Sequence, residues 1–332
     1  MQRKVKPSAE QRLIARYFRP LASHPGAFGL ADDAAAITLP AGYDLVLTTD
    51  GVIAGVHVFA DEPADFIARR ALRMNLSDLA AKGATPLGFL LALSLPAGTK
   101  KSWIAAFARG LGEDAKRFGC VLLGGDTDHT PGPAAVSIAA FGAVPHGKMV
   151  RRSTAKVGDV VVATGTIGDA ALGVKLRRDP RLAKRWRLGK AEADELIRRY
   201  RLPQPRNALA RAVLRYASAA IDISDGLAGD LDKLCRGSKV AADIDVAGVP
   251  FSEAARAALT AEPRLMQTVL TGGDDYEIAL TVAPKKLAAF RRAAEAAGVP
   301  VTEIGRIQRG AGARFVQEGR ALNFARPAYS HF

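Results

Sequence analysis

Acidic side chains recur directly after short apolar segments of this sequence. In AIDISDGLAGDL, Asp222 and Asp225 flank a serine, follow the apolar Ile221 and precede a glycine. Five further segments share this design, and their acids are Asp32, Asp33, Asp50, Asp78, Asp126, Asp128, Asp274, Asp275 and Glu277. Any single one is also explained as a turn residue or a helix cap. Six segments of one design favour a shared chemical role.

Magnesium binding is the chemistry that these residue types suit best. Mg²⁺ prefers carboxylate and hydroxyl oxygens together with water and substrate phosphates. Acids at the ends of different strands would converge on one crevice, where open α/β sheets bind their ligands. Bare carboxylates gathered there repel one another, and metal ions with a polyphosphate would relieve that repulsion. The residues alone therefore predict a magnesium-dependent, phosphate-handling protein in which Asp222 and Asp225 are ligands.

Alternating strands and helices must position these acids. The apolar pattern predicts strands at 43–49, 87–95, 120–123 and 134–144 and helices at 63–82 and 100–118. Five more strand-like segments follow a loop rich in proline, glycine and basic residues, PHGKMVRRSTAKVGD. The alternation predicts an α/β fold. The loop predicts a boundary between an N-terminal domain at 1–147 and a C-terminal domain at 148–332.

Composition excludes some classes of protein. The 332 residues suffice for one or two domains, and 48% hydrophobic with 24% charged residues is ordinary for a globular chain. We expect no membrane helix, because no apolar run reaches the roughly 18 residues needed. The N-terminus has no apolar core followed by a cleavage site, so we expect no signal peptide and a cytoplasmic location. Cys120 and Cys235 lie in apolar surroundings and predict buried, inert thiols.

The excess of basic residues admits two interpretations. There are 47 basic and 33 acidic residues, which gives a net charge of +14. Much of the excess lies between Lys175 and Arg215. A nucleic-acid surface is one interpretation, but Trp186 and Tyr200 are the segment's main aromatic residues for base stacking. Solvated, arginine-rich helices are the favoured interpretation.

Competing phosphate-binding and catalytic motifs are weak. GAVPHGKM has the spacing of a P-loop, but Met149 stands where a magnesium-binding hydroxyl belongs. ATGTIGDA departs from the dinucleotide-binding pattern and predicts a tight strand-to-helix turn, with phosphate contact still open. The five histidines have no metal-ligand spacing. For His57, substrate contact and simple packing are equally consistent with the sequence.

Several separated motifs, from about Leu13 to the C-terminus, together resemble the thiamine-monophosphate kinase family. They are DDAA, TTDGVIAGVHVF, NLSDLAAKGATP, GGDT, RRSTAKVGD, TGTIGDAALG, LPQPR, IDISDGLAGDL and GGDDYE. The combination is far more specific than any one motif. The chain departs from the family pattern at Ala31, which replaces a glycine, at Val58, which is inserted, and at Asp274, where Glu is common.

The resemblance implies a fold and a reaction. The fold is shared with aminoimidazole ribonucleotide synthetase: an N-terminal mixed-sheet domain that binds ATP and pairs into a homodimer, and a C-terminal α/β domain that completes the active site. The implied reaction converts ATP and thiamine monophosphate into ADP and thiamine diphosphate, the last step of thiamine diphosphate synthesis, over several magnesium ions.

The resemblance also implies roles for individual residues. The implied metal ligands are Asp33, Thr48, Thr49, Asp50, Asp78, Asp126, Asp222 and Asp225. Gly125, Asp126, Arg152 and Ser224 would bind the nucleotide, and His57, Asp274 and Phe324 would face the thiamine substrate. Asp50, Asp78, Asp126 and Arg152 would serve catalysis. Direct in-line transfer without a phosphoenzyme is expected, because a phosphate monoester with a second pKa of about 6 needs no base.

Other functions remain as alternatives. Selenophosphate synthetase is disfavoured, because the first cysteine is Cys120 and no reactive N-terminal one exists. For aminoimidazole ribonucleotide synthetase, only GGDDYE and the thiamine-side motifs argue against it. A magnesium-dependent nuclease would use the acids as a two-metal site and would bind nucleic acid with strong salt dependence.

Overall fold

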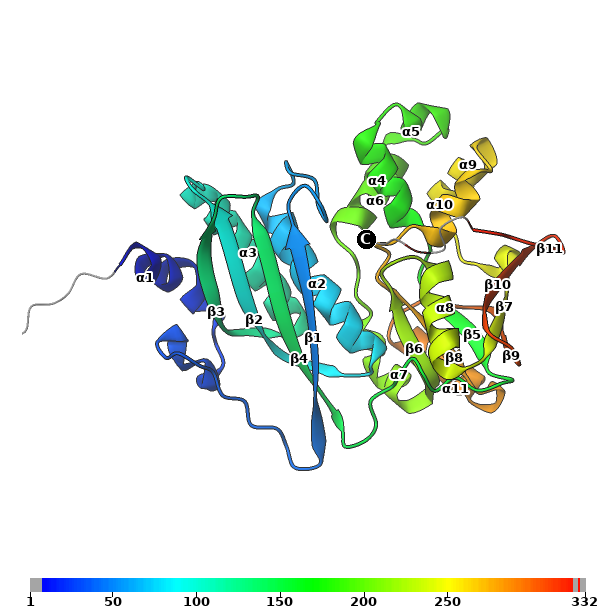
Figure 1. Ribbon diagram of the computed structural model, residues 1–332, viewed down its shortest axis with the longest axis horizontal. Helices are drawn as coiled ribbons and strands as arrows, with labels where there is room; N and C mark the ends of the chain where they lie inside the picture. The colour runs from blue at the N-terminus through cyan, green and yellow to red at the C-terminus, as the bar shows by residue number, and fades with distance from the viewer. Residues whose placement is uncertain (1–7, 325–327, 329–332) are drawn as a thin grey trace, which may run out of the picture. The chain divides into compact units, whose positions relative to one another are not determined.

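Two compact units make up the chain. The computed structural model describes residues 8–324 and residue 328 (Figure 1). The first unit comprises the residues up to 76 together with 86–146, and the second comprises 77–85 together with the residues from 147 onward. The short segment 77–85 thus packs with the second unit, although it precedes most of the first unit's sheet in sequence.

A four-stranded sheet forms the first unit, in the order β1-β4-β2-β3. Its strands are β1 (Tyr43–Ile53), β2 (Thr85–Pro96), β3 (Val121–Thr130) and β4 (Ala135–Pro145). β1 pairs with β4 antiparallel, whereas β2 and β3 are parallel, so the sheet is mixed. The helices α2 (Ala64–Ala81) and α3 (Lys101–Phe118) lie behind this sheet in Figure 1. Before it come α1 (Ala9–Leu13) and the short turns η1 (Ile14–Phe18), η2 (Arg19–Leu21) and η3 (Pro25–Leu30).

The two faces of this sheet differ in exposure. Along β1, Val46 and Val52 are buried, whereas Leu45 and Leu47 are 43% and 62% exposed. Successive side chains of a strand point to opposite faces, so one face of β1 packs inward and the other presents apolar side chains to solvent. Thr48 and Asp50 share the face of Val46 and Val52.

A seven-stranded mixed sheet forms the second unit, in the order β11-β10-β7-β9-β5-β8-β6. Its strands are β5 (Val160–Thr164), β6 (Ala217–Ile223), β7 (Ala241–Asp245), β8 (Glu277–Val282), β9 (Val301–Gln308), β10 (Gly312–Gln317) and β11 (Arg320–Ala321). Its helices are α4 (Asp169–Arg178), α5 (Leu182–Arg185), α6 (Lys190–Arg201), η4 (Asn207–Leu209), α7 (Ala210–Tyr216), α8 (Leu227–Ser238), η5 (Val246–Gly248), α9 (Glu253–Ala261), α10 (Leu265–Thr271) and α11 (Pro284–Ala296).

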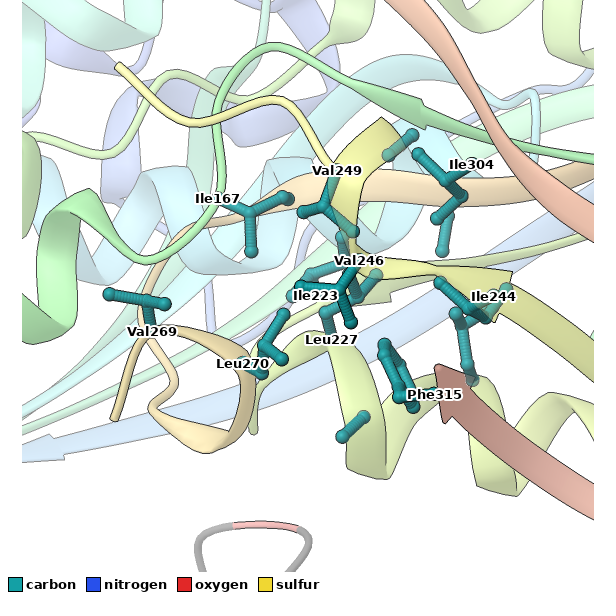
Figure 2. Packing of buried hydrophobic residues seen from close by; sticks show 14 of the residues in the cluster. Ile167, Ile223, Leu227, Ile244, Val246, Val249, Val269, Leu270, Ile304 and Phe315 are labelled. Carbon is teal, nitrogen blue, oxygen red and sulfur yellow. The ribbon is translucent and has the colours of Figure 1, made fainter. Parts of the chain in front are cut away.

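The central strands of this sheet are buried along their whole length. All side chains of β5 and β8 are buried, as continuous apolar runs predict for strands covered on both faces. One cluster contains Ile223, Leu227, Ile244 and Phe315, which converge in Figure 2. A second cluster contains Phe290 of α11. Strands that bear acids at their ends are thereby anchored in a packed core.

The expected alternation of strands and helices is confirmed in both units, with two differences. β1 and β3 continue three and four residues beyond Asp50 and Asp126, so these acids lie within strands and not at their ends. Backbone pairing explains the first extension, because β1 remains paired with β4 as far as Ile53. β10 and β11 were not predicted, since their sequence lacks a sustained apolar run. Across the described residues, every helix is too short or too polar to span a bilayer.

Candidate active site

A cavity of about 740 Å³ opens in the first unit. Apolar side chains form most of its wall, among them Phe18, Leu30 and Phe141. Its polar lining comes from Asp32, Asp33, Gly124, Gly125, Asp126 and Thr127. A cavity with apolar walls and a few convergent polar groups is the usual form of a small-molecule site. The structure therefore brings together Asp33, Gly125 and Asp126, three of the residues named from sequence.

The second glycine of GGDT is required by the backbone. Gly125 has φ of 153°, and a Cβ there would lie 1.9 Å from the carbonyl oxygen of Leu91. Only glycine permits this approach of β3 to β2. The next residue, Asp126, is exposed, and its Oδ1 accepts a hydrogen bond of 2.9 Å from the backbone N–H of Thr127. The strand thus presents a carboxylate and bare backbone at the cavity.

The predicted ligands on β1 do not line this cavity and lie on two faces of the strand. Thr48 and Asp50 point to the inward face, whereas Thr49 is exposed on the opposite one. The Thr49 hydroxyl donates to the carbonyl oxygen of Ile138 on β4, at 3.1 Å. His57 lies in the turn after β1, where its Nδ1 accepts a hydrogen bond of 3.0 Å from the N–H of Ile53. That bond fixes the ring and leaves Nε2 as the ring atom with the proton.

Asp222 lies near two other carboxylates in the second unit. Burial, and then the nearby carboxylates of Asp78 and Asp230, raise the pKa of Asp222 well above its ordinary value. Asp222 is the penultimate residue of β6, and Asp78 lies on the last part of α2. Lys82, one turn after Asp78, donates from Nζ to the carbonyl oxygen of Ala220 at 3.1 Å. The residues of two distant motifs, MNLSDLA and AIDISDG, therefore form one acidic cluster.

Asp225 is held by a lysine that the sequence analysis missed. Lys233 Nζ donates to Asp225 and, at 2.8 Å, to Asp230 on the same helix, α8. Asp230 also accepts from the backbone N–H of Asp225 at 2.9 Å. Burial raises the pKa of Asp230 to about 6, although Lys233 opposes this. The signal was present in the spacing, since Asp230 and Lys233 lie three residues apart and therefore face each other on a helix.

The loop that carries Asp274 is joined to the loop that carries Ser224. The N–H of Asp274 donates to the carbonyl oxygen of Ser224 at 2.8 Å, and the N–H of Tyr276 donates to that of Ile223 at 2.9 Å. A Cβ on Gly273 would lie 2.1 Å from the Ser224 oxygen. Asp274 itself has φ of 76°, a backbone conformation that costs free energy in a non-glycine residue. The two motifs therefore form a single backbone assembly.

Not all acids of GGDDYE are available to serve as metal ligands. Asp275 is buried and accepts from the N–H groups of Gly168, at 2.7 Å, and Ala170, at 3.3 Å. It thereby caps the N-terminus of α4 from a distant loop. Burial raises the pKa of Asp275 well above its ordinary value, while these two amides act in the opposite direction. For Asp275 the capping role is the one that the structure supports.

Arg152 and Phe324 are the remaining predicted residues. Arg152 is exposed, and its carbonyl oxygen accepts from the Ser238 hydroxyl at 2.9 Å. Its charge is close enough to Lys82 to lower the pKa of that lysine, after burial, which is the larger cause. The ring of Phe324 packs edge-on against Phe315, with 5.5 Å between ring centroids, at the margin of the second unit's core.

Each unit thus holds its own group of acids. Within residues 8–324 and 328, no three acidic, histidine or cysteine side chains lie close enough to hold a metal ion together. Bare carboxylates repel one another, so they turn to donors nearby, as Asp126 does to a backbone amide and Asp225 to Lys233.

Comparison with known proteins decides the family. Residues 31–144 match the model of the AIR synthase related protein, N-terminal domain, and residues 156–317 match that of the C-terminal domain. A thiamine-monophosphate kinase from Caulobacter vibrioides is 42% identical over 98% of this chain and 91% of its own. The chain belongs to the thiamine-monophosphate kinase family.

Solved structures agree with this assignment. The crystal structure of thiamine-monophosphate kinase from Stenotrophomonas maltophilia K279a has a TM-score of 0.82 and 37% identity, over 94% of this chain and 96% of its own. A structure described as "AaThiL complexed with AMPPCP and TMP" has a TM-score of 0.77 and 26% identity, over 91% of both chains. The predicted two-domain α/β fold is therefore confirmed, and the chain is an enzyme of this kinase family.

Proposed function

We propose that this enzyme transfers the γ-phosphate of ATP to thiamine monophosphate, which gives ADP and thiamine diphosphate. The observation that carries the proposal is the match of almost the whole chain, at 42% identity, to a thiamine-monophosphate kinase. The neighbour described with AMPPCP and TMP supports it, since AMPPCP is an analogue of ATP. The reaction would complete thiamine diphosphate synthesis, and we propose that it takes place in the cytoplasm, where ATP is available.

The cavity of the first unit is the proposed place of the nucleotide. Its apolar wall suits a purine base, and the bare backbone of Gly125 lets phosphates approach closely. Arg152 supplies a fixed positive charge for a phosphate, and Ser224 supplies a hydroxyl. His57, Asp274 and Phe324 are the proposed contacts of the thiamine substrate.

Magnesium is the proposed cofactor, and the donor chemistry fits it. Asp33, Thr48, Thr49, Asp50, Asp78, Asp126, Asp222 and Asp225 remain the proposed ligand set. All offer oxygen atoms, the type that Mg²⁺ prefers. The raised pKa of Asp222 beside Asp78 and Asp230 reflects a local excess of negative charge, which a divalent cation would offset. When bound, the ions would neutralise the phosphates and align donor with acceptor.

The protein's own residues then need only bind and orient. The acceptor is a phosphate monoester with a second pKa of about 6, so it is largely ionised at neutral pH. No side chain has to remove a proton from it. We therefore propose direct in-line transfer, with Asp50, Asp78, Asp126 and Arg152 holding charges in place and no phosphorylated protein intermediate.

A homodimer through the first unit is part of the proposal. The outward face of its sheet exposes Tyr43, Leu47 and Ile53, each at least 37% exposed. Apolar side chains gathered on one face are typical of interaction surfaces. A second copy of the chain would cover them.

The test is product formation from defined acceptors. We would incubate the protein with ATP and Mg²⁺ and with thiamine monophosphate, thiamine or no acceptor, and then measure ADP and thiamine diphosphate. The proposal predicts thiamine diphosphate from the monophosphate alone. No turnover by folded protein would contradict it, and so would a phosphorylated protein trapped by rapid quenching.

Asp225→Asn tests the metal side of the proposal. The substitution removes one charge but leaves Lys233 paired with Asp230, so the fold should persist. We expect the magnesium concentration for half-maximal activity to rise at least about tenfold, because ligand charge sets the affinity of such sites. Asp194→Asn, which removes an exposed acid paired with Lys190, is the matched control and should change nothing.

A further inference from the structure

A buried cluster of ion pairs lies beneath the loop that carries Asp274. The Glu277 carboxylate is fully buried at the start of β8. It accepts hydrogen bonds from Arg199 Nη2 at 2.7 Å, from Arg206 Nε at 2.6 Å and from the Thr164 hydroxyl at 2.7 Å. Arg206 Nη2 makes a further bond to the same carboxylate. One carboxylate therefore joins α6, the segment LPQPR and the end of β5.

The charges of this cluster depend on one another. Burial alone would raise the pKa of Glu277, but Arg206, Arg199 and Thr164 outweigh it and hold that pKa below its ordinary value. Arg199 also lies 3.8 Å from Asp169, which accepts from the hydroxyls of Thr166 and Ser252. A buried ion pair of this kind keeps its charges only while all partners stay in place.

The cluster is continuous with the proposed substrate loop along the backbone. Asp275, two residues before Glu277, is bonded to the turn at Gly168. Asp274 and Tyr276 each directly precede one of these two bonded residues in the sequence, and they have φ values of 76° and 50°. Their N–H groups bind the carbonyl oxygens of Ser224 and Ile223. Strained residues persist only where the surrounding contacts hold the backbone in place. Here the neighbouring side chains of Asp275 and Glu277 are held by their hydrogen bonds.

We infer that Arg206 and Glu277 are positioning residues, which set the geometry of the Gly272–Tyr276 loop and, through its backbone, of the loop with Ser224. The inference rests on the proposed function, in which Asp274 faces the acceptor. It gives a physical role to LPQPR and TGTIGDAALG, two motifs without an assigned chemical role. Neither residue touches a reacting atom; both act through Asp274.

Hydrogen exchange measured by mass spectrometry tests this directly. Arg206→Ala leaves Glu277 with Arg199 and Thr164, and we expect amide exchange in 272–277 and 222–226 to accelerate about tenfold or more, since local opening sets exchange. Arg206→Lys keeps the charge but loses the bidentate bond, so it should recover part of the protection. Arg314→Ala, which removes an arginine from the exposed pair with Asp243, is the matched control and should leave both loops unchanged.

Kinetics supply the second readout. We expect the KM for thiamine monophosphate to rise about tenfold in Arg206→Ala, more than the KM for ATP, with partial rescue by Arg206→Lys, as for other supporting contacts of a site. Unchanged exchange in these two loops would overturn the inference, and so would equal acceleration throughout the second unit. If wild-type protein forms no thiamine diphosphate, the proposed function fails, while the exchange experiment still decides the positioning role.

Discussion

At the scale of single residues, burial decides which reactive groups of this chain take part in chemistry. Cys120 and Cys235 are both fully buried. Burial raises the pKa of each thiol to about 12, helped at Cys235 by Asp232. The thiolate is the reactive form of cysteine, so both residues should be inert in the native protein.

Thiol labelling checks this prediction. A raised pKa means that the thiolate appears only as the pH approaches 12, whereas an unfolded cysteine has a pKa of about 8.5. At pH 8 we expect labelling by an aromatic disulfide reagent to be about a thousandfold slower in native than in denatured protein, since that is the ratio of thiolate fractions. In denaturant, both Cys120 and Cys235 should react rapidly. Rapid labelling of either thiol in folded protein would show the prediction to be wrong.

The acids show what sequence can and cannot predict about single residues. A local pattern was enough to select Asp126, which lines the cavity of the first unit, because an acid after a glycine and an apolar run is visible in the sequence. The same pattern selected Asp275 and Glu277, which cap a helix and pair with arginines. Their partners lie 71 to 113 residues away in the chain, so no local pattern distinguishes them from ligands.

At the scale of elements, close packing of loops explains the glycines of GGDDYE. Gly273→Ala would place a Cβ 2.1 Å from the carbonyl oxygen of Ser224, and backbone cannot move aside as a side chain can. We expect a loss of about 1–3 kcal/mol in the free energy of unfolding, as overpacking usually costs, together with weaker binding of the acceptor. Chemical denaturation and the KM for thiamine monophosphate measure the two effects.

Gly237→Ala is the matched control for that substitution. Gly237 lies within α8, in the same unit. A Cβ added there would lie 3.6 Å from its nearest neighbour, the Cβ of Ser153, which is an ordinary packing distance. Alanine favours helix over glycine by about 0.8–1.0 kcal/mol, so this variant should be as stable as the wild type or more stable. Equal loss in both variants would mean that loop packing is not the cause.

Long, periodic elements could be predicted, and short or irregular ones could not. The helix expected at 100–118 is α3, Lys101–Phe118, because its apolar side chains repeat at helical spacing. β10 at Gly312–Gln317 has no such pattern, and it is a strand because it pairs with β7. The path of the segments before β1 is likewise set by packing, since η3 contains Phe28 and Gly29 at positive φ.

At the scale of the whole molecule, acidic partners accompany several basic side chains of the most basic segment in a chain with a net charge of +14. Around α5 and α6, Arg181 pairs with Asp179, Arg185 with Glu262, Lys190 with Asp194 and Arg198 with Glu195. Each pair offsets a charge that would otherwise attract a polyanion. Trp186, one of the few aromatic residues there, is buried and donates to Glu262.

We therefore predict weak binding of nucleic acid. Fluorescence anisotropy with a short DNA duplex should give a Kd weaker than about 1 µM at physiological salt, the range of non-specific contacts. Binding should vanish as salt rises, and DNA at that concentration should not inhibit the kinase. Tighter binding, with a steep dependence on salt, would favour a nucleic-acid partner for the segment 175–215.

The division of α2 between the two units limits which fragments of the chain can fold on their own. Residues up to 76 belong to the first unit and 77–85 to the second, so one continuous helix contributes to both cores. In the second unit, Ala80 and Ala81 pack in the cluster of Phe290, and Gly83 lies against Leu214. A gene fragment encoding only residues 148–332 would leave a hole there. A chimera that combines the N-terminal half of one relative with the C-terminal half of another would have to take residues 77–85 from the same relative as the C-terminal half.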